Sequence, residues 1–163
     1  MNALPENGFH TPAGYKAQKD GGLTESMEDY LEMICRHCRE YGYIRINTLS
    51  RQLHVKPSSA SKMAAHLKEA GLVEFEKYGI VKPSETGWRL GGYLLHRHEV
   101  LADFFTILNR SDSQLELVEQ VEHFMDHTTV DRLELLNHFL RDNEIYQMYL
   151  ERMNGNGKSD SVP

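Results

Sequence analysis

Carboxylate and imidazole side chains recur at helical spacing in the segment 118–123, Val-Glu-Gln-Val-Glu-His. On a helix, Glu119, Glu122, His123 and Asp126 share one face, because residues three, four and seven positions apart lie on the same side. The opposite face holds the apolar side chains Leu117, Val118, Val121, Phe124 and Met125. Two carboxylates and an imidazole within one turn can converge on one cation. An acidic stripe opposite an apolar one is also typical of a solvated helix face, so the spacing alone leaves both interpretations open.

A second pair of carboxylates, Asp29 and Glu32, lies on one face of a helix predicted over residues 26–41. These two side chains could contribute to the same cation site if that helix packs beside the segment 118–123. Each also has an ordinary structural role. Asp29 fits a capping box with Ser26, and Glu32 is placed to pair with Arg36 one turn later.

Other side chains that often bind metals are the histidines and cysteines. His96 and His98 lie in a helix predicted over residues 85–109, where a histidine more often makes interior hydrogen bonds than binds a metal. Cys35 and Cys38 are spaced as C-x-x-C, but a structural zinc site needs four ligands and the chain has no other cysteine. Both cysteines are therefore predicted to be buried free thiols.

The middle of the chain has the pattern of a winged helix-turn-helix. Asn47 is expected to cap a short helix over 48–53, and after a turn a second helix follows over 57–70. Alternating apolar and polar residues over 72–76 and 80–82, with a turn between them, predict a β-hairpin. A hairpin directly after a helix-turn-helix occupies the position of a wing.

A block of basic residues coincides with this helix-turn-helix. Residues 45–82 contain seven Lys or Arg and three Glu, a net charge of +4, within a chain of net charge −6. Such a local excess indicates where a nucleic acid would bind. Small hydroxyl side chains allow a helix to enter the major groove, and a lysine reaches a phosphate or base edge. The residues expected to contact DNA are Lys56, Pro57, Ser58, Ser59, Ser61, Lys62, His66 and Lys77.

The composition suits one or two small soluble domains: the chain has 163 residues, of which 40% are hydrophobic and 26% charged. No stretch approaches the roughly 20 apolar residues that span a bilayer. Residues 1–22 lack the apolar run of a signal peptide, so a cytoplasmic location is expected. A last helix predicted over 130–140 has an apolar stripe suited to a core or an interface.

Four segments occur together in the order and spacing of a known family. They are Ser-Met-Glu-Asp-Tyr-Leu-Glu at 26–32, Lys-Pro-Ser-Ser-Ala-Ser-Lys-Met at 56–63, Arg-His-Glu-Val-Leu at 97–101 and Val-Glu-Gln-Val-Glu-His at 118–123. With them, the chain resembles the diphtheria toxin repressor family over residues 23–142, and most closely its manganese transport regulator branch. The resemblance implies a dimeric winged-helix repressor that binds DNA when loaded with a divalent metal.

The resemblance also implies a set of metal ligands. Carried over residue by residue, they fall on Asp29, Glu32, His98, Glu119, Glu122 and His123, and every position holds a ligand of the expected type. The iron branch of the family has Met where Asp29 stands and Cys where Glu119 stands. Hard oxygen ligands suit Mn²⁺ better than sulfur does. The expected cofactor is therefore Mn²⁺, two ions per subunit, with Fe²⁺ or Zn²⁺ as alternatives.

The fold class implied is mainly α: an N-terminal winged helix-turn-helix with a small β-hairpin wing, followed by an α-helical metal-binding and dimerisation domain. The expected boundaries are a flexible arm at 1–22, the winged-helix domain at 23–84, the helical domain at 85–145 and a C-terminal tail at 146–163. The expected function is a manganese-responsive repressor of metal-transport genes. It binds operator DNA as a homodimer, with no membrane and no organic cofactor, and metal clamps its DNA-binding domain to its dimerisation domain.

Three other functions fit parts of the pattern. The first is an iron- or zinc-responsive regulator of the same fold. The second is a dinuclear-metal enzyme in a helix bundle, which uses paired Glu-x-x-His motifs, and no Glu-x-x-His occurs in the chain. The third is a winged-helix regulator that senses an organic ligand, which leaves the six matched ligand positions unexplained.

Overall fold

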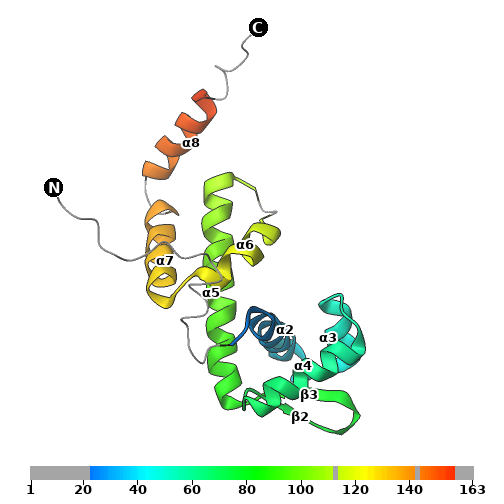
Figure 1. The fold of residues 1–163 in the computed structure, drawn as a ribbon. Coiled ribbons are helices and arrows are strands. Elements are labelled where there is room, and N and C mark those ends of the chain that lie inside the picture. The colour runs from blue at the N-terminus through cyan, green and yellow to red at the C-terminus, as the bar shows by residue number, and fades with distance from the viewer. Residues whose placement is uncertain (1–22, 112–113, 142–143, 157–163) are drawn as a thin grey trace, which may run out of the picture.

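The computed structural model describes residues 23–111, 114–141 and 144–156 (Figure 1). The arm expected at 1–22 lies outside the described residues. A long helix, α5 (Glu85–Asn109), runs through the molecule and joins two lobes. Residues 25–83 form the winged-helix lobe, and residues 115–141 and 144–156 form the helical lobe. Within the described ranges, no helix has the length and apolarity needed to cross a membrane.

The winged-helix lobe confirms the predicted fold class. Strand β3 is the middle strand of a three-stranded antiparallel sheet, in which Val73 of β2 lies opposite Pro83 and Ile44 of β1 lies opposite Val81. The 3-10 turn at Lys77–Gly79 joins β2 to β3 and completes the wing. The elements of this lobe are α2 (Glu25–Tyr41), β1 (Ile44–Arg45), α3 (Ile46–Gln52), α4 (Pro57–Glu69), β2 (Val73–Phe75) and β3 (Ile80–Pro83).

One hydrophobic core holds this lobe against α5. It takes fully buried side chains from every layer, including Leu31, Leu49, Leu67, Val81 and Leu94. Helices α2 and α5 cross very closely, because a Cβ placed on Gly91 would lie 2.2 Å from Sγ of Cys35. Cys35 and Cys38 are buried free thiols, as predicted. This tight crossing fixes α2 relative to α5, and both helices supply candidate metal ligands.

Two helix starts differ from the predictions. Helix α2 is capped by Thr24, whose Oγ1 accepts a hydrogen bond from the backbone N–H of Met27, and not by Ser26. Helix α3 begins at Ile46 directly after the extended residue Arg45, and not after a cap at Asn47. In both places the extended backbone that precedes the helix ends earlier than expected. Asp29 therefore lies beyond the first turn of α2 and has no capping role.

The helical lobe consists of α6 (Leu115–Val121), the 3-10 helix η2 (Glu122–Phe124), α7 (His127–Arg141) and α8 (Glu144–Asn156). The single helix expected through 118–123 is wrong, because the α-helix ends at Val121 and the backbone becomes extended at Met125. The expected apolar face is only partly buried: Val118 is enclosed, whereas Phe124 is 52% exposed.

The last helix, α8, covers most of the segment that was expected to be a tail from residue 146 onward. Its residues 146, 149, 150 and 153 are apolar or aromatic and recur at helical spacing. The hydroxyl of Tyr149 donates to the carbonyl of Leu108, and Nη1 of Arg110 donates to Oδ1 of Asn154. These contacts attach α8 to the end of α5. The tail predicted from residue 146 onward is therefore wrong as far as residue 156, because the polar residues after 153 do not prevent the preceding residues from forming a helix.

Candidate metal centre

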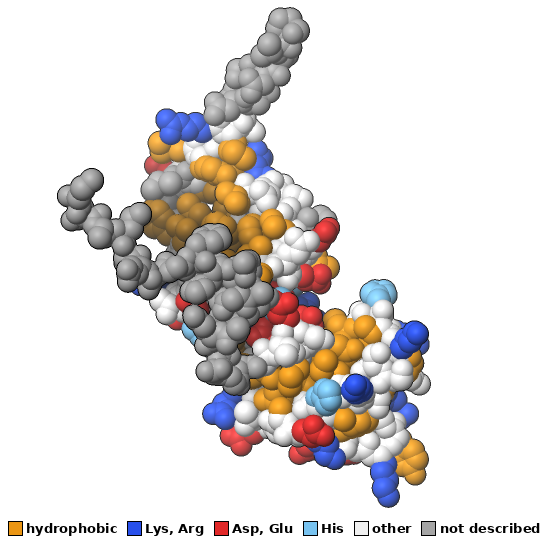
Figure 2. All heavy atoms as spheres, in the orientation of Figure 1, with side chains coloured by type: hydrophobic (Ala, Val, Ile, Leu, Met, Phe, Trp, Pro, Cys, Tyr) orange, Lys and Arg blue, Asp and Glu red, His pale blue; other side chains and the backbone are white. Residues whose placement is uncertain are grey.

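A cavity of about 580 Å³ opens between the two lobes. Figure 2 shows acidic side chains gathered at the waist between the lobes. The cavity is lined by residues from α2, the end of α3, α5 and the α6–η2 segment. It includes all six predicted metal ligands: Asp29, Glu32, His98, Glu119, Glu122 and His123.

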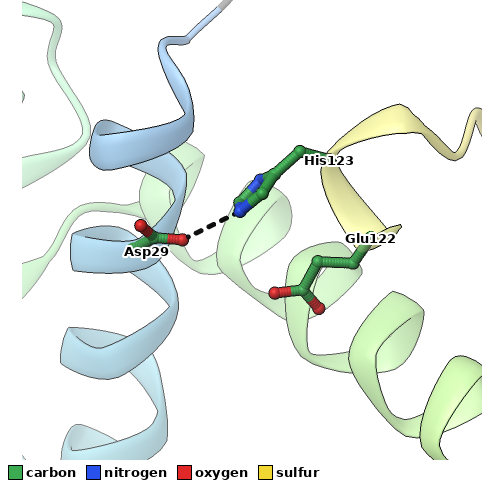
Figure 3. Close-up of side chains that lie close together, drawn as sticks. All are labelled: Asp29, Glu122 and His123. Carbon is green, nitrogen blue, oxygen red and sulfur yellow. Dashed lines mark ion pairs between the residues drawn. The ribbon is translucent and has the colours of Figure 1, made fainter. Parts of the chain in front are cut away.

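The outer candidate metal-binding group, called the outer group below, consists of Asp29, Glu122 and His123 (Figure 3). Each residue offers one ligand atom, and these atoms lie within 4.8 Å of one another. Nε2 of His123 is 3.1 Å from Oδ1 of Asp29. The Asp29 side chain is 48% exposed and that of His123 only 10%, so this group lies at the mouth of the cavity.

The inner candidate metal-binding group, called the inner group below, consists of Glu32, His98 and Glu122, again with candidate ligand atoms within 4.8 Å of one another. Nδ1 of His98 is 3.0 Å from Oε2 of Glu122 and 3.8 Å from Oε1 of Glu32. The Glu32, His98 and Glu122 side chains are 11%, 12% and 3% exposed. Glu122 belongs to both groups, so it is the residue that joins them.

The local backbone explains how these side chains meet. Asp29 and Glu32 are three positions apart on α2 and therefore project from one face. His98 comes from the middle of α5. The change from α6 to the 3-10 helix η2 occurs at Glu122, which is 2% exposed, and it brings Glu122 and His123 to face α2 and α5. The α6–η2 segment thus brings Glu122 and His123 to one candidate cation site, as was expected of a single straight helix.

The electrostatics of the site favour positive charge. Hydrogen bonds to Asp29 and then Glu28 raise the pKa of His123 to about 9. The hydrogen bond to Glu122 raises the pKa of His98. Burial, and then the nearby charge of Glu122, raise the pKa of Glu32. Carboxylates that lie close together in a partly buried site are stabilised by a nearby positive charge, and the oxygen and imidazole donors here fit a divalent metal.

Five of the six predicted ligands therefore fall into two compact groups. Glu119 is exposed and lines the same cavity, but among the described residues it joins neither group. Glu32 also makes the predicted pair with Arg36, whose Nη2 is 2.6 Å from Oε1 of Glu32. The two roles predicted for Glu32 are compatible with one another.

The predicted DNA-contact residues lie away from this cavity, on α4, its preceding turn and the wing. Ser61 is half-buried and the others are exposed. The exposed residues are Lys56, Pro57, Ser58, Ser59, Lys62, His66 and Lys77.

Two residues at the metal centre were missed from the sequence. Glu28 accepts a hydrogen bond at 2.9 Å from Nδ1 of His123 and forms an ion pair at 2.8 Å with Arg97. Glu28 stands beside Asp29 and Arg97 stands beside His98, so both lay within segments that had been singled out. Helical spacing could not reveal them, because each projects from its helix in a different direction from its neighbour.

The chain is similar to several known transcriptional regulators. Residues 22–81 match the family described as iron dependent repressor, N-terminal DNA binding domain. The HTH-type transcriptional regulator MntR of Oceanobacillus iheyensis is 37% identical over 122 residues, which cover 73% of this chain and 82% of that protein. MntR of Shouchella clausii is 34% identical over 122 residues, covering 74% and 85%. The chain belongs to the diphtheria toxin repressor family, in its manganese transport regulator branch.

Solved structures agree with this membership. The crystal structure of IdeR from T. acidophilum has a TM-score of 0.56 and 25% sequence identity, and the match covers 69% of this chain and 53% of that one. The family consists of DNA-binding regulators, so the chain is a metal-responsive transcriptional repressor and not an enzyme. The dinuclear enzyme considered from the sequence is thereby excluded.

Proposed function

We propose that this protein is a manganese-responsive repressor of metal-transport genes, in which the cation acts as corepressor. The observation that carries the proposal is the position of Glu122. It belongs to both metal-binding groups, and each group also takes a carboxylate from α2 of the winged-helix lobe. A cation in either group is therefore held by residues from both lobes.

The donor atoms support Mn²⁺ as the metal. In both groups, as far as the chain is described, the donors are carboxylate oxygens and imidazole nitrogens, with no sulfur. Such ligands suit Mn²⁺, although affinity alone favours later metals such as Zn²⁺. One ion in each group, with Glu122 shared, gives two ions per subunit. Glu119 lines the cavity and is proposed as a further ligand.

The same residues connect metal loading to DNA binding. A bound cation supplies the positive charge that offsets the carboxylates. Without that charge, Glu32 on α2 repels Glu122 on η2, which weakens the contact between the two lobes. When the ligands converge, they hold α2 against η2 and α5. Because α4 packs in the same core as α2, its orientation is fixed too. The population thus shifts toward the DNA-competent arrangement.

The protein is proposed to act as a homodimer on double-stranded operator DNA in the cytoplasm. The helical lobe exposes large apolar side chains, among them Leu135 at 71% and Met148 at 66%. Apolar surface of this kind suits a second copy of the chain. In a two-fold dimer the clamp would set the two α4 helices about one DNA turn apart, roughly 34 Å. The exposed Ser and Lys side chains of α4 would then enter successive major grooves.

Operator binding, titrated with Mn²⁺, Fe²⁺ and Zn²⁺ in separate experiments, tests the proposal. The DNA is a candidate metal-transporter promoter, and a chelator provides the metal-free reference. We expect Mn²⁺ to increase DNA affinity by about 5- to 150-fold, the usual size of such coupling. A larger increase with Fe²⁺ or Zn²⁺ at buffered cellular concentrations would assign a different metal. Equal affinity with chelator and with every metal would refute a metal-dependent repressor.

A further inference from the structure

The ring of His123 is held at both of its nitrogens by neighbouring residues of α2. Nε2 lies 3.1 Å from Oδ1 of Asp29, and Nδ1 lies 2.9 Å from Oε2 of Glu28. Asp29 belongs to the outer metal-binding group, whereas Glu28 belongs to neither group formed by the described residues. The two carboxylates therefore have different relations to a metal, although they are adjacent in the sequence.

Glu28 is fixed by a buried arginine. Its Oε2 accepts a hydrogen bond from Nη2 of Arg97 at 2.8 Å, and this same oxygen contacts His123. Arg97 is 3% exposed, and its Nε is buried without a hydrogen-bond partner among the described residues. A buried guanidinium is strongly unfavourable unless a carboxylate faces it, so Glu28 is not free to swing away and bind a cation. Burial acts to raise the pKa of Glu28, but hydrogen bonds from His123 and Arg97 lower it overall.

We propose that Glu28, anchored by Arg97, is a positioning residue that accepts the Nδ1–H bond of His123 and thereby presents Nε2 to the outer metal ion. The proposal rests on the proposed function, because it assigns a role relative to that metal. A metal-bound histidine commonly donates its second N–H to a carboxylate, which fixes the orientation of the ring and raises its basicity. Here the carboxylate is itself fixed by an ion pair.

The arrangement also joins three elements before any metal binds. Glu28 is on α2, Arg97 is on α5 and His123 is on η2. Tyr93 lies one turn before Arg97 on α5, and the centroid of its ring is 6.0 Å from the guanidinium carbon of Arg97. The same ring stacks on His127 of α7. These contacts already hold α2, α5 and η2 together in the metal-free protein, so the ligands of the outer group need less ordering when the metal binds.

The test compares Glu28→Ala and Glu28→Gln with the control Glu40→Ala, which removes an exposed carboxylate at the other end of α2. Mn²⁺ affinity is measured by calorimetry on the full chain. We expect Glu28→Ala to weaken Mn²⁺ binding by about 10- to 100-fold, as loss of an outer-shell partner typically does. Glu28→Gln keeps an oxygen acceptor for Nδ1–H and should recover part of that loss. Glu40→Ala should match the unmodified protein.

A second measurement does not depend on the metal. In the metal-free protein, NMR should detect a slowly exchanging Nδ1 proton of His123, because the Glu28 carboxylate protects it. Glu28→Ala should abolish that signal and Glu40→Ala should keep it. Unchanged Mn²⁺ affinity together with an unchanged proton signal in Glu28→Ala would overturn the positioning role.

The outcomes also separate this proposal from the function it rests on. If the unmodified protein binds no Mn²⁺, the proposed function fails, whereas the Nδ1 proton still tests the contact between Glu28 and His123. If Glu28→Ala does not fold, Glu28→Gln decides, because it removes the charge that pairs with Arg97. We expect its Mn²⁺ affinity to be lower than that of Glu40→Ala, and an equal affinity would refute the role.

Discussion

The inner and outer candidate metal-binding groups share Glu122 but differ in their access to water. The Glu32 side chain of the inner group is 11% exposed, whereas Asp29 of the outer group is 48% exposed. Interactions between charges strengthen as the surroundings become less polar. Unneutralised carboxylates therefore repel more strongly in the inner group. We infer that the inner group contributes most of the energy that couples metal to DNA, and that the outer group adjusts affinity and metal preference.

Glu122→Gln should have the largest effect, because it removes the residue that both groups share. We expect the Mn²⁺-dependent gain in operator affinity, about 5- to 150-fold, to be lost. The metal-free fold should survive, since glutamine can still accept the hydrogen bond from His98. Operator binding with and without Mn²⁺ measures the first effect and circular dichroism the second. Glu116→Gln, an exposed site on α6, is the matched control. A normal Mn²⁺ response in Glu122→Gln would show that Glu122 does not join the two groups.

The pH dependence of Mn²⁺ affinity should show whether the outer group binds the metal, because its residue His123 has a pKa of about 9. Its ordinary value is 6.5, so between pH 6.5 and 9 a metal must displace a proton. Outer-site Mn²⁺ affinity should rise by about tenfold per pH unit across this range and then level off.

The stability of the metal-free protein should change in the opposite direction. A raised pKa in the folded state means that the contribution of His123 is complete below pH 6.5 and lost as the pH passes 9. The metal-free melting temperature should therefore fall over this range more in the unmodified protein than in His123→Ala. Calorimetric titrations and thermal melts at several pH values check both trends. Mn²⁺ affinity that does not change with pH would show that His123 is not a ligand.

The carboxylate-to-amide pair Glu32→Gln and Asp29→Asn compares the two groups by the same chemical change. Glu32→Gln should reduce the Mn²⁺-induced rise in melting temperature more than Asp29→Asn does, because binding to the folded state stabilises it by mass action. In the metal-free protein at pH 7, Asp29→Asn should lower the melting temperature only by the loss of its ion pair with His123, since Thr24 and not Asp29 caps α2. Equal losses in the two variants would remove the distinction between inner and outer groups.

Asp29→Met should have the smallest effect, a change in preference between metals. It places a thioether at the exposed end of the outer group, as in the iron branch of the family. Softer ligands should narrow the preference for Mn²⁺ over Fe²⁺ while the inner group still binds. Competition titrations of the two metals, made without oxygen, measure the ratio. If the ratio does not change, Asp29 does not determine metal preference.

The sequence predicted local elements well where turn residues and spacing agree. The helices predicted over 26–41 and 57–70 end at Tyr41 and Glu69, just before Gly42 and Gly71, which adopt φ of +78° and +72°. The end of α6 at Val121 was not predictable, because helical spacing continues through Glu122 and His123 while their tertiary contacts impose a 3-10 turn. Helix α8 was not predicted, because the polar Gly- and Asn-rich composition of residues 154–163 is typical of a tail, whereas the apolar residues at 146, 149, 150 and 153 allow a helix that packs on α5.

The metal centre was predictable only in part. Glu32 could be named from its spacing with Asp29, whereas His98 could be named only because the resemblance supplied a position for it. The sequence could not show that Glu32 and His98 are more buried than Asp29, because burial depends on how α2, α5 and η2 pack together. Glu28 and Arg97, 69 positions apart, form a pair that no local pattern indicates. Contacts between distant segments of this kind need a structure before they can be assigned.

The most direct test of the clamp is the affinity of Mn²⁺ measured with and without operator DNA. Coupling between two binding sites is reciprocal, so operator DNA must tighten Mn²⁺ binding by the same factor by which Mn²⁺ tightens operator binding. We expect the two factors to agree, and both to be lost in Glu122→Gln. If Mn²⁺ binds with the same affinity whether or not operator DNA is present, metal binding and DNA binding are not coupled. That result would contradict the proposed clamp through Asp29, Glu32, His98, Glu122 and His123.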